Sequence, residues 1–330
     1  MNKSKKTIVF GIGDDFHEFA DEILSNNNVC ALMDNDAGKQ GTMFRALRVH
    51  APDELGKNAY DDILITSSAY CGAIRKQIEE LGVPAEKIRT FALMEAHINK
   101  ALGGIAGKTV LDIGCGAGNE VKALAAQFMP RRIVGIDISV HESTEGVNWA
   151  LSHGDAANLD FADESFDAIY SRGAFEHIRD IKKTLAEVKR VLKKGGVFYC
   201  TFGAIWTSIQ GWHDNGDAKL IEAMPPWCHL YMTDAELARQ FAQNGFDDIG
   251  WMDYIKNHLN HYSRTELVNF IMFSGMRVKR YTENTMFRKS VTAAFDSELT
   301  DDICQKIVKA GYRARDLGIC SMDFTLEKMD

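Results

Sequence analysis

Short blocks of apolar and polar residues alternate along the N-terminal part of the chain and predict a repeating strand–helix order. Apolar runs rich in β-branched residues predict buried strands at 7–12, 29–33 and 62–66. Between them, apolar residues recur every three or four positions over 16–24 and 71–81, which is the spacing of one face of a helix. Because strands that return through helices pair in parallel, this order predicts a parallel sheet with helices on both faces.

A second alternation of the same kind begins after the glycine-rich segment 103–107. Its predicted strands lie at 109–113, 133–138, 166–171 and 197–202, with helices at 120–128 and 178–192 and, further on, helices at 263–276 and 301–315 and strands at 277–281 and 320–326. The predicted fold class is therefore α/β, with two tandem doubly wound, Rossmann-like units.

The domain boundaries follow from these patterns. We expect an accessory domain at 1–90, a linker helix at 91–107 and the main domain at 108–330, with 204–262 as an inserted lid or acceptor region. The insertion holds four of the five tryptophans, and aromatic faces suit a sugar ring or a flat natural product, although an ordinary core explains them too. The long connection 283–318 indicates an addition that faces the acceptor or a second copy in a homodimer.

Composition narrows the function classes. With 330 residues, of which 45% are hydrophobic, the chain is long enough for two packed domains. A formal net charge of −8 argues against a general binder of nucleic acid or anionic membranes. The seven cysteines contain no Cys-x-x-Cys pair, so we expect reduced thiols in a cytoplasmic protein rather than disulfides or structural zinc. No apolar run is long enough for a signal-peptide core or a membrane span.

The strongest chemical signal is the segment VLDIGCGAGNE at 110–120, where a strand ends in Asp112 and a glycine turn follows. Gly114, Gly116 and Gly118 clear side chains from the turn and let a ligand approach the backbone. A carboxylate at this place repels phosphate and attracts an ammonium group, and the third glycine of a dinucleotide fingerprint is missing. We therefore expect a nucleoside with an amino-acid tail rather than a dinucleotide.

Two further carboxylates follow the next predicted strands. Asp137 closes the strand in VGIDIS, where a carboxylate can accept hydrogen bonds from both ribose hydroxyls. Asp155, in GDAANLDF, follows the expected third strand and could read an adenine amino group, although aspartate before a turn is also common for structural reasons.

These segments, with FDAIYSRGAFEHI and EVKRVLKKGGVFYC, resemble the ordered motifs of class I S-adenosylmethionine-dependent methyltransferases, most closely the small-molecule subgroup with an FEHI-type segment. The resemblance covers about residues 108–202 and implies a class I methyltransferase fold for the second unit, with S-adenosylmethionine as the cofactor. By position, it implies cofactor contacts from Asp112, Gly114, Cys115, Gly116, Gly118, Asp137, Ile138, Asp155, Ala156, Ser171 and Arg172.

Methyl transfer requires the protein to position an acceptor and remove its proton, and histidine is the natural base near neutral pH. His213, in GWHD, is the first candidate because it follows the predicted fifth strand closely, and Asp214 could orient it or bind a divalent ion. His177 and His229 are the next candidates. Each histidine is equally well explained by a hydrogen bond to a backbone carbonyl. No His, Asp and Glu set shows clear ligand spacing, so no metal ligands are predicted, and a metal-assisted variant of the reaction stays open.

A second glycine turn, GIGDDF at 11–16, follows the first predicted strand. It matches only two glycines of a dinucleotide fingerprint and places two acids near the expected pyrophosphate, although Asp34 ends the next strand as a ribose-binding acid would. The pattern of residues 5–90 resembles the small Rossmann-like domain of bacterial polysaccharide-biosynthesis enzymes. That resemblance implies a carbohydrate-type acceptor and leaves a nucleotide-sugar pocket or a docking role open for this domain.

The sequence thus predicts an S-adenosylmethionine-dependent methyltransferase that O-methylates a sugar, nucleotide sugar or glycosylated metabolite, with N-methylation as second choice. Its expected partner is a small-molecule or carbohydrate acceptor and not a nucleic acid. Two alternatives remain open. One is an NAD-dependent oxidoreductase that uses the N-terminal glycine turn, and the other is a non-catalytic scaffold that binds S-adenosylmethionine.

Overall fold

The computed structural model describes residues 5–57, 59–209, 211–213, 224–245, 249–285 and 301–329. The chain divides into two compact units, Met1–His97 and Ile98–Asp330. The division falls inside helix α3 (Leu93–Ala101), later than the predicted domain end at residue 90, so the predicted linker helix contributes to both units. Among the helices of the described residues, none has the length and apolar character needed to cross a membrane.

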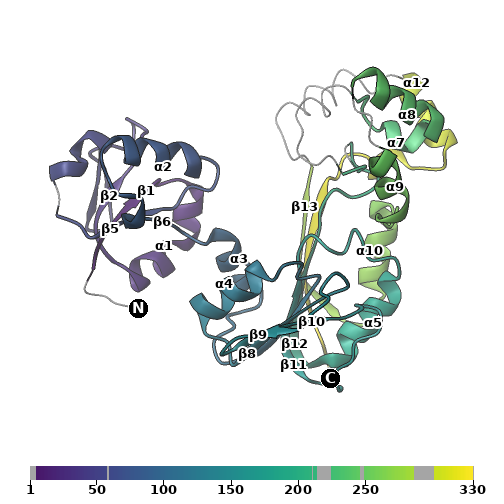
Figure 1. Cartoon of the computed structure of the whole chain (residues 1–330), viewed down its shortest axis with the longest axis horizontal. Helices are drawn as coiled ribbons and strands as arrows, with labels where there is room; N and C mark the ends of the chain where they lie inside the picture. The colour runs from purple at the N-terminus through teal and green to yellow at the C-terminus, as the bar shows by residue number, and fades with distance from the viewer. Residues whose placement is uncertain are drawn as a thin grey trace. The chain divides into compact units, whose positions relative to one another are not determined.

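The first unit is built on a six-stranded sheet with the order β3-β4-β2-β1-β5-β6 (Figure 1). Its elements are β1 (Lys6–Phe10), α1 (Asp14–Asn26), β2 (Asn28–Met33), β3 (Met43–Phe44), β4 (Leu47–His50), β5 (Asp62–Ile65), α2 (Cys71–Glu80) and β6 (Ile88–Thr90). Strand β1 pairs in parallel with β2 on one side and with β5 on the other. Consecutive residues of β1 are buried because both faces of the sheet are covered.

The second unit is built on an eight-stranded sheet with the order β13-β14-β12-β11-β7-β8-β10-β9. Its strands are β7 (Thr109–Ile113), β8 (Arg132–Asp137), β9 (Thr144–Glu145), β10 (Trp149–His153), β11 (Phe166–Ser171), β12 (Leu192–Phe202), β13 (Arg277–Asn284) and β14 (Ser321–Glu327). Strands β10, β8, β7, β11 and β12 are parallel, whereas β14 runs antiparallel between β12 and β13. The mostly parallel sheet agrees with the predicted α/β class.

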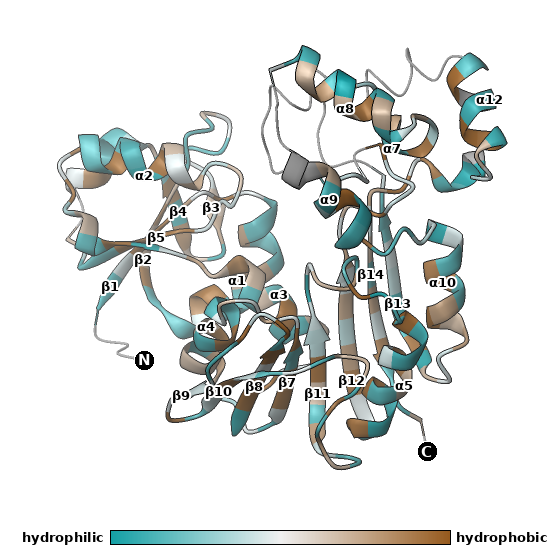
Figure 2. Ribbon diagram, turned by 45° about the vertical axis from the view of Figure 1, so that its right-hand side comes forward, coloured by the Kyte–Doolittle hydropathy of each residue, from teal (hydrophilic) through white to brown (hydrophobic). Residues whose placement is uncertain are grey.

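Helices pack on both faces of this second sheet because side chains along a strand alternate in direction. In β7, Val110 packs with α3 and with α4 (Asn119–Phe128), whereas Leu111 and Ile113 pack with α5 (Ile181–Val191) and α10 (Arg264–Met272). Figure 2 shows apolar residues concentrated in the strands β7, β8 and β11. Because both faces of β7 are buried, its residues form a nearly continuous apolar run in the sequence.

A separate group of short helices, called the cap helices here, comes from the segment after β12 and from the segment between β13 and β14. It consists of α7 (Cys228–Tyr231), α8 (Asp234–Gln243), α9 (Ile249–Asn257) and α12 (Asp301–Lys309), with α12 packed against α7 although the two are far apart in sequence (Figure 1). Trp206, Trp212 and Trp227 lie in the hydrophobic cluster of these helices and are buried. These three tryptophans therefore form a core and not an exposed aromatic surface.

The order of the strands also marks where a ligand can bind. From β7 the chain winds through β8 to β10 on one side of the sheet, and then returns to β11 on the other side of β7. In open parallel sheets, ligands bind beyond the carboxyl ends of the strands, where the winding direction changes. The predicted cofactor residues lie at or just beyond the carboxyl ends of β7, β8, β10 and β11, so the fold gathers them at this place.

Candidate active site

The glycine turn after β7 is fixed by its backbone. The amide of Gly114 donates to the carbonyl of Ile136 in β8 at 2.8 Å. Gly114, Gly116 and Gly118 have φ angles of 81°, 50° and 73°, a left-handed region that favours glycine. A Cβ added to Gly114 would lie 2.2 Å from the Cβ of Ala174, in the loop after β11. The absence of this side chain allows the two loops to touch.

Asp112 lies just before this turn and is only 2% exposed. Burial raises the pKa of its carboxyl well above the usual range, the hydroxyl of Tyr170 lowers it, and Glu120 raises it further. The Tyr170 hydroxyl is itself buried and makes no hydrogen bond of good geometry with the described residues. A buried carboxyl and hydroxyl without a cation are costly, and a bound ammonium group relieves that cost. These residues fit the amino-acid end of S-adenosylmethionine.

Asp137, at the end of β8, already holds neighbouring groups. One carboxylate oxygen accepts from the amide and hydroxyl of Ser139 at 2.8 and 2.7 Å, and the other accepts from the Gly116 amide at 2.9 Å. Burial raises the pKa of Asp137, but these hydrogen bonds outweigh it and the net pKa is lowered. The ionised carboxylate keeps lone pairs for ribose hydroxyls. Beside it, the apolar side chain of Ile138 is 71% exposed, as expected next to an adenine ring.

Three other predicted cofactor residues lie near the same edge. Asp155 is exposed, and one of its oxygens accepts from the Ala157 amide at 2.9 Å, which is the turn-forming role that the sequence also allowed. Ala156 is buried. Cys115 is half-buried, and burial together with the charges of Asp112 and Asp137 raises its thiol pKa to about 12, so the thiol is not a nucleophile near neutral pH.

Two predicted cofactor residues at the carboxyl end of β11, Ser171 and Arg172, have partners of their own. The Ser171 hydroxyl is buried and donates to the carbonyl of Ile113 at 2.7 Å. Arg172 forms an ion pair with Glu120 of α4. Both contacts connect the end of β11 to the region of the glycine turn. The side chains of Ser171 and Arg172 therefore help to position the two loops.

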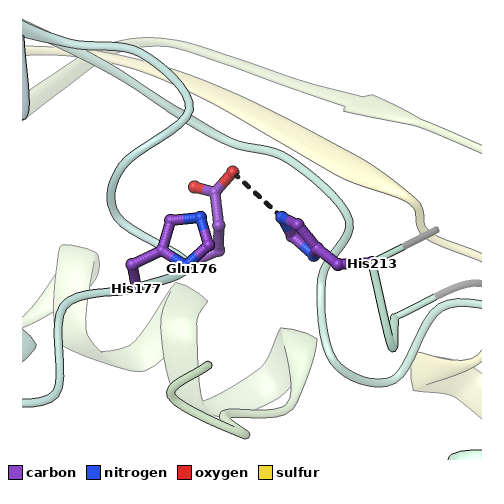
Figure 3. Close-up of side chains that lie close together, drawn as sticks. All are labelled: Glu176, His177 and His213. Carbon is purple, nitrogen blue, oxygen red and sulfur yellow. Dashed lines mark ion pairs between the residues drawn. The ribbon is translucent and has the colours of Figure 1, made fainter. Parts of the chain in front are cut away.

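Three side chains from two separate segments meet beyond the ends of β11 and β12 (Figure 3). Glu176 and His177 follow β11, and His213 follows β12. We call them the Glu176 trio. Their candidate ligand atoms all lie within 4.8 Å of one another, and Nε2 of His213 is 3.9 Å from Oε1 of Glu176. The structure thus brings together two predicted catalytic histidines and adds a glutamate that the sequence analysis did not select, although it stands beside His177 in FEHI.

Within the Glu176 trio, Glu176 is buried, His177 and His213 are half-buried, and the pairing among the described residues is incomplete. Glu176 is 7% exposed, burial raises its pKa to about 7, and its Oε2 has no hydrogen-bond partner among the described residues. Burial and the neighbouring His177 lower the pKa of His213 to about 4, and Nδ1 of His213 also lacks a partner in the described part of the chain. At neutral pH His213 is therefore neutral, whereas the Glu176 carboxyl is about half ionised.

A backbone contact orients the ring of His177. Its Nδ1 lies 2.8 Å from the backbone carbonyl of His258. Because a carbonyl only accepts, Nδ1 is the donor in this contact, and in the neutral ring Nε2 is then the nitrogen with the lone pair. A backbone contact therefore orients this ring and selects the tautomer whose free nitrogen is Nε2.

Asn260 holds the loop that carries Glu176 and His177. Its side-chain amide donates to the carbonyls of Phe175 and Ile178 at 2.7 and 3.0 Å, and its backbone amide donates to the carbonyl of Glu176 at 3.0 Å. Its role cannot be predicted from the sequence, because nothing in the segment HLNHYS distinguishes it from an ordinary turn asparagine.

His229, another predicted catalytic residue, does not join the trio. His229 is buried among the cap helices, Nε2 of its ring donates to the Trp206 carbonyl at 2.7 Å, and burial lowers its pKa to about 3. This is the arrangement of a histidine that satisfies a backbone carbonyl in a core. Asp214 lies outside the described residues.

In the first unit, the N-terminal glycine turn uses its own donors internally. The Gly11 amide donates to the Met33 carbonyl at 2.9 Å, and the Ile12 amide donates to the Asp34 carboxylate at 2.6 Å. Phe16, at the position of the missing third glycine, is fully buried. Because the Ile12 amide already binds the acid that a ribose would use, and the Gly11 amide already binds a carbonyl, this geometry argues against the NAD alternative.

Comparison with known proteins agrees with the assignment of the second unit. Residues 111–200 match a family described as "Methyltransferase domain", and residues 3–89 match one described as "C2185-like, N-terminal". A fatty-acid O-methyltransferase of Mycolicibacterium smegmatis is 27% identical over 43% of this chain and 53% of its own length. A demethylmenaquinone methyltransferase of Tropheryma whipplei is 28% identical over 60% of this chain and 92% of its own length.

Other matches are shorter or weaker. A sterol 24-C-methyltransferase of Aspergillus fumigatus is 34% identical over 33% of this chain and 32% of its own length, so the chain spans only a third to a half of several curated relatives. Among solved structures, a geranyl diphosphate C-methyltransferase from Streptomyces coelicolor aligns with a TM-score of 0.45 and 14% identity, over 80% of this chain and 85% of that one.

The methyltransferase-domain match supports a class I S-adenosylmethionine-dependent methyltransferase. It also confirms the predicted cofactor, S-adenosylmethionine. The link of the first unit to polysaccharide biosynthesis is not shown by these matches, because its family description names no activity.

Proposed function

We propose that this protein transfers the methyl group of S-adenosylmethionine to an oxygen of a hydroxyl-bearing small molecule, with a carbohydrate-type acceptor preferred. The observation that carries the proposal is the buried Asp112 carboxyl, which lies beside a glycine turn within the segment that matches a methyltransferase domain. A buried acid at this place needs a cationic ligand, and the amino group of S-adenosylmethionine is such a group.

The predicted cofactor contacts can be divided among the strand ends. Asp112 and the turn from Gly114 to Gly118 bind the methionine end, with Ser171 and Arg172 beside it. Asp137 binds the ribose hydroxyls, and Ile138 packs on the adenine. When bound, S-adenosylmethionine supplies an electrophilic methyl carbon on its sulfonium, so the remaining task of the chain is to hold the acceptor and take up its proton.

The Glu176 trio is the proposed acceptor side of the site. It follows β11 and β12, and the contact between Gly114 and Ala174 brings its loop against the cofactor turn. One buried and two half-buried polar groups favour an acceptor that brings a hydroxyl, because an apolar acceptor offers no hydrogen bond to Glu176 or His213. The named relatives act on a fatty acid, a sterol and demethylmenaquinone, so lipid-type acceptors are the competing class.

In this proposal His213 and His177, with Glu176, lower the cost of removing the acceptor's proton. Replacing His213 by alanine should spare cofactor binding and lower the rate roughly 100- to 10,000-fold.

Two other features stay predictions. Titration of nucleotide sugars into the full-length protein tests whether the first unit binds one. Analytical ultracentrifugation tests whether the protein forms a homodimer.

The central experiment is calorimetric titration of S-adenosylhomocysteine into the full-length protein and its Asp112→Ala variant, with Asp160→Ala as a matched control at an exposed aspartate. Wild type and control should bind equally, and Asp112→Ala should not bind measurably. Transfer of labelled methyl groups to a panel of glycosides, nucleotide sugars, fatty acids and quinols then identifies the acceptor. Binding that survives Asp112→Ala would refute the proposed cofactor site.

A further inference from the structure

We propose that Glu176, His177 and His213 bind one divalent metal ion, with Zn²⁺ as the best fit. Two imidazoles and one carboxylate form the ligand set of many catalytic zinc sites, in which a fourth position stays open for a substrate or water. Nitrogen ligands favour Zn²⁺ over Mg²⁺, which prefers oxygen. The sequence showed no such site because its ligands lie 36 residues apart, from 177 to 213, without motif spacing.

The geometry allows this ion with small side-chain movements. The three ligand atoms lie within 4.8 Å of one another, and Nε2 of His213 is 3.9 Å from Oε1 of Glu176. Around Zn²⁺, ligand atoms about 2.0 to 2.2 Å from the metal lie roughly 3.4 Å from each other. The side chains therefore close by about an ångström on the ion, which rotation about their own bonds provides.

Two further observations point to a ligand at this place. The side chain of Glu176 is only 8% exposed, and its Oε2 has no hydrogen-bond partner among the described residues. Nδ1 of His177 donates to the His258 carbonyl, which leaves Nε2 as the lone-pair donor. Metal-binding histidines are commonly fixed by such a contact from the other ring nitrogen.

The use of the ion rests on the proposed methyl transfer, whereas its binding does not. The ion lowers the pKa of the acceptor hydroxyl, as it does for bound water. The hydroxyl releases its proton to solvent, the new O–CH₃ bond forms, and the S–CH₃ bond breaks to leave S-adenosylhomocysteine. No electron donor or acceptor is needed, so a redox-inactive ion is sufficient.

The test uses untagged full-length protein freed of metal by chelator dialysis. Zn²⁺ and Mg²⁺ are titrated by calorimetry into wild type, Glu176→Gln, His177→Gln and His213→Gln, with His50→Gln as a matched control in the first unit. We expect one Zn²⁺ per chain in wild type and control, at least about 10-fold weaker Mg²⁺ binding, and a loss of at least 100-fold in Zn²⁺ affinity in each ligand variant. S-adenosylhomocysteine binding checks that each variant is folded.

Two outcomes overturn the proposal: wild type that binds no Zn²⁺ at micromolar concentrations, or Zn²⁺ binding that the three variants leave unchanged. If a variant fails to fold, the rise in melting temperature of wild type with Zn²⁺, and its absence with Mg²⁺, decides instead. Full methyl-transfer activity in metal-free protein would refute the catalytic use of the ion while the methyltransferase assignment stands. Trio-dependent Zn²⁺ binding without any methyl transfer would support the site and refute the proposed function.

Discussion

The close contact between the cofactor turn and the loop after β11 gives a quantitative prediction for Gly114→Ala. The new Cβ would lie 2.2 Å from the Cβ of Ala174, and the residue would keep a φ of 81°. A left-handed conformation costs a non-glycine residue about 1–2 kcal/mol, and forcing an extra methyl into a packed contact costs about 1–3 kcal/mol. We expect the free energy of unfolding of the second unit to fall by roughly 2–5 kcal/mol.

A matched control lies in the same turn. Gly116 has a φ of 50°, but a Cβ added there would meet nothing within 4 Å, so Gly116→Ala should cost only the conformational part, about 1–2 kcal/mol. Urea unfolding of the cofactor-free protein, followed by tryptophan fluorescence, measures both values. All five tryptophans belong to the second unit, so this signal reports on it alone.

A second-site change separates the clash from the conformational cost. Adding Ala174→Gly to Gly114→Ala removes the opposing Cβ and should recover most of the difference between the two single variants. Equal destabilisation by Gly114→Ala and Gly116→Ala would refute the reasoning, because it would mean that the two loops separate without cost.

Three further predictions concern buried polar groups. Asp112→Asn should raise the unfolding free energy of the cofactor-free protein at pH 7, because burial raises the pKa of this carboxyl and makes its ionised form costly. The same variant should not bind S-adenosylhomocysteine. A variant less stable than wild type would contradict this reasoning. His229 has a pKa of about 3 when folded and about 6.5 when unfolded, so its contribution to stability is complete above pH 6.5 and is lost as pH falls towards 3. From pH 7.5 to 5 this amounts to about 2 kcal/mol, and His229→Gln should lose correspondingly less stability in urea unfolding over that range; an identical pH dependence would show that the ring is not held neutral. Asn260→Ala removes two hydrogen bonds to the loop that carries Glu176 and should lower the methyl-transfer rate while leaving S-adenosylhomocysteine affinity unchanged, and an equal loss of both would indicate a general structural defect.

Much of the second sheet could be predicted from local pattern. The strands at Thr109–Ile113 and Phe166–Ser171 have the predicted bounds, because both faces of these strands are buried and the apolar run is continuous. The sequence pattern does not predict the bounds of strand β10 or of the helices α8 and α9, because their apolar residues are mixed with polar ones. Partial burial leaves a weak pattern in the sequence.

The sequence by itself was sufficient to predict the α/β class, the glycine turn after Asp112 and the cofactor. These depend on residues that are neighbours in sequence, where a strand, its terminal acid and the following turn form one continuous segment. The tertiary structure alone decided which histidines meet. His213 joins Glu176 and His177, whereas His229 turns into the core of the cap helices. The physical reason is that each side chain's surroundings come from segments distant in sequence, and neither burial nor an unpaired oxygen is encoded by local spacing.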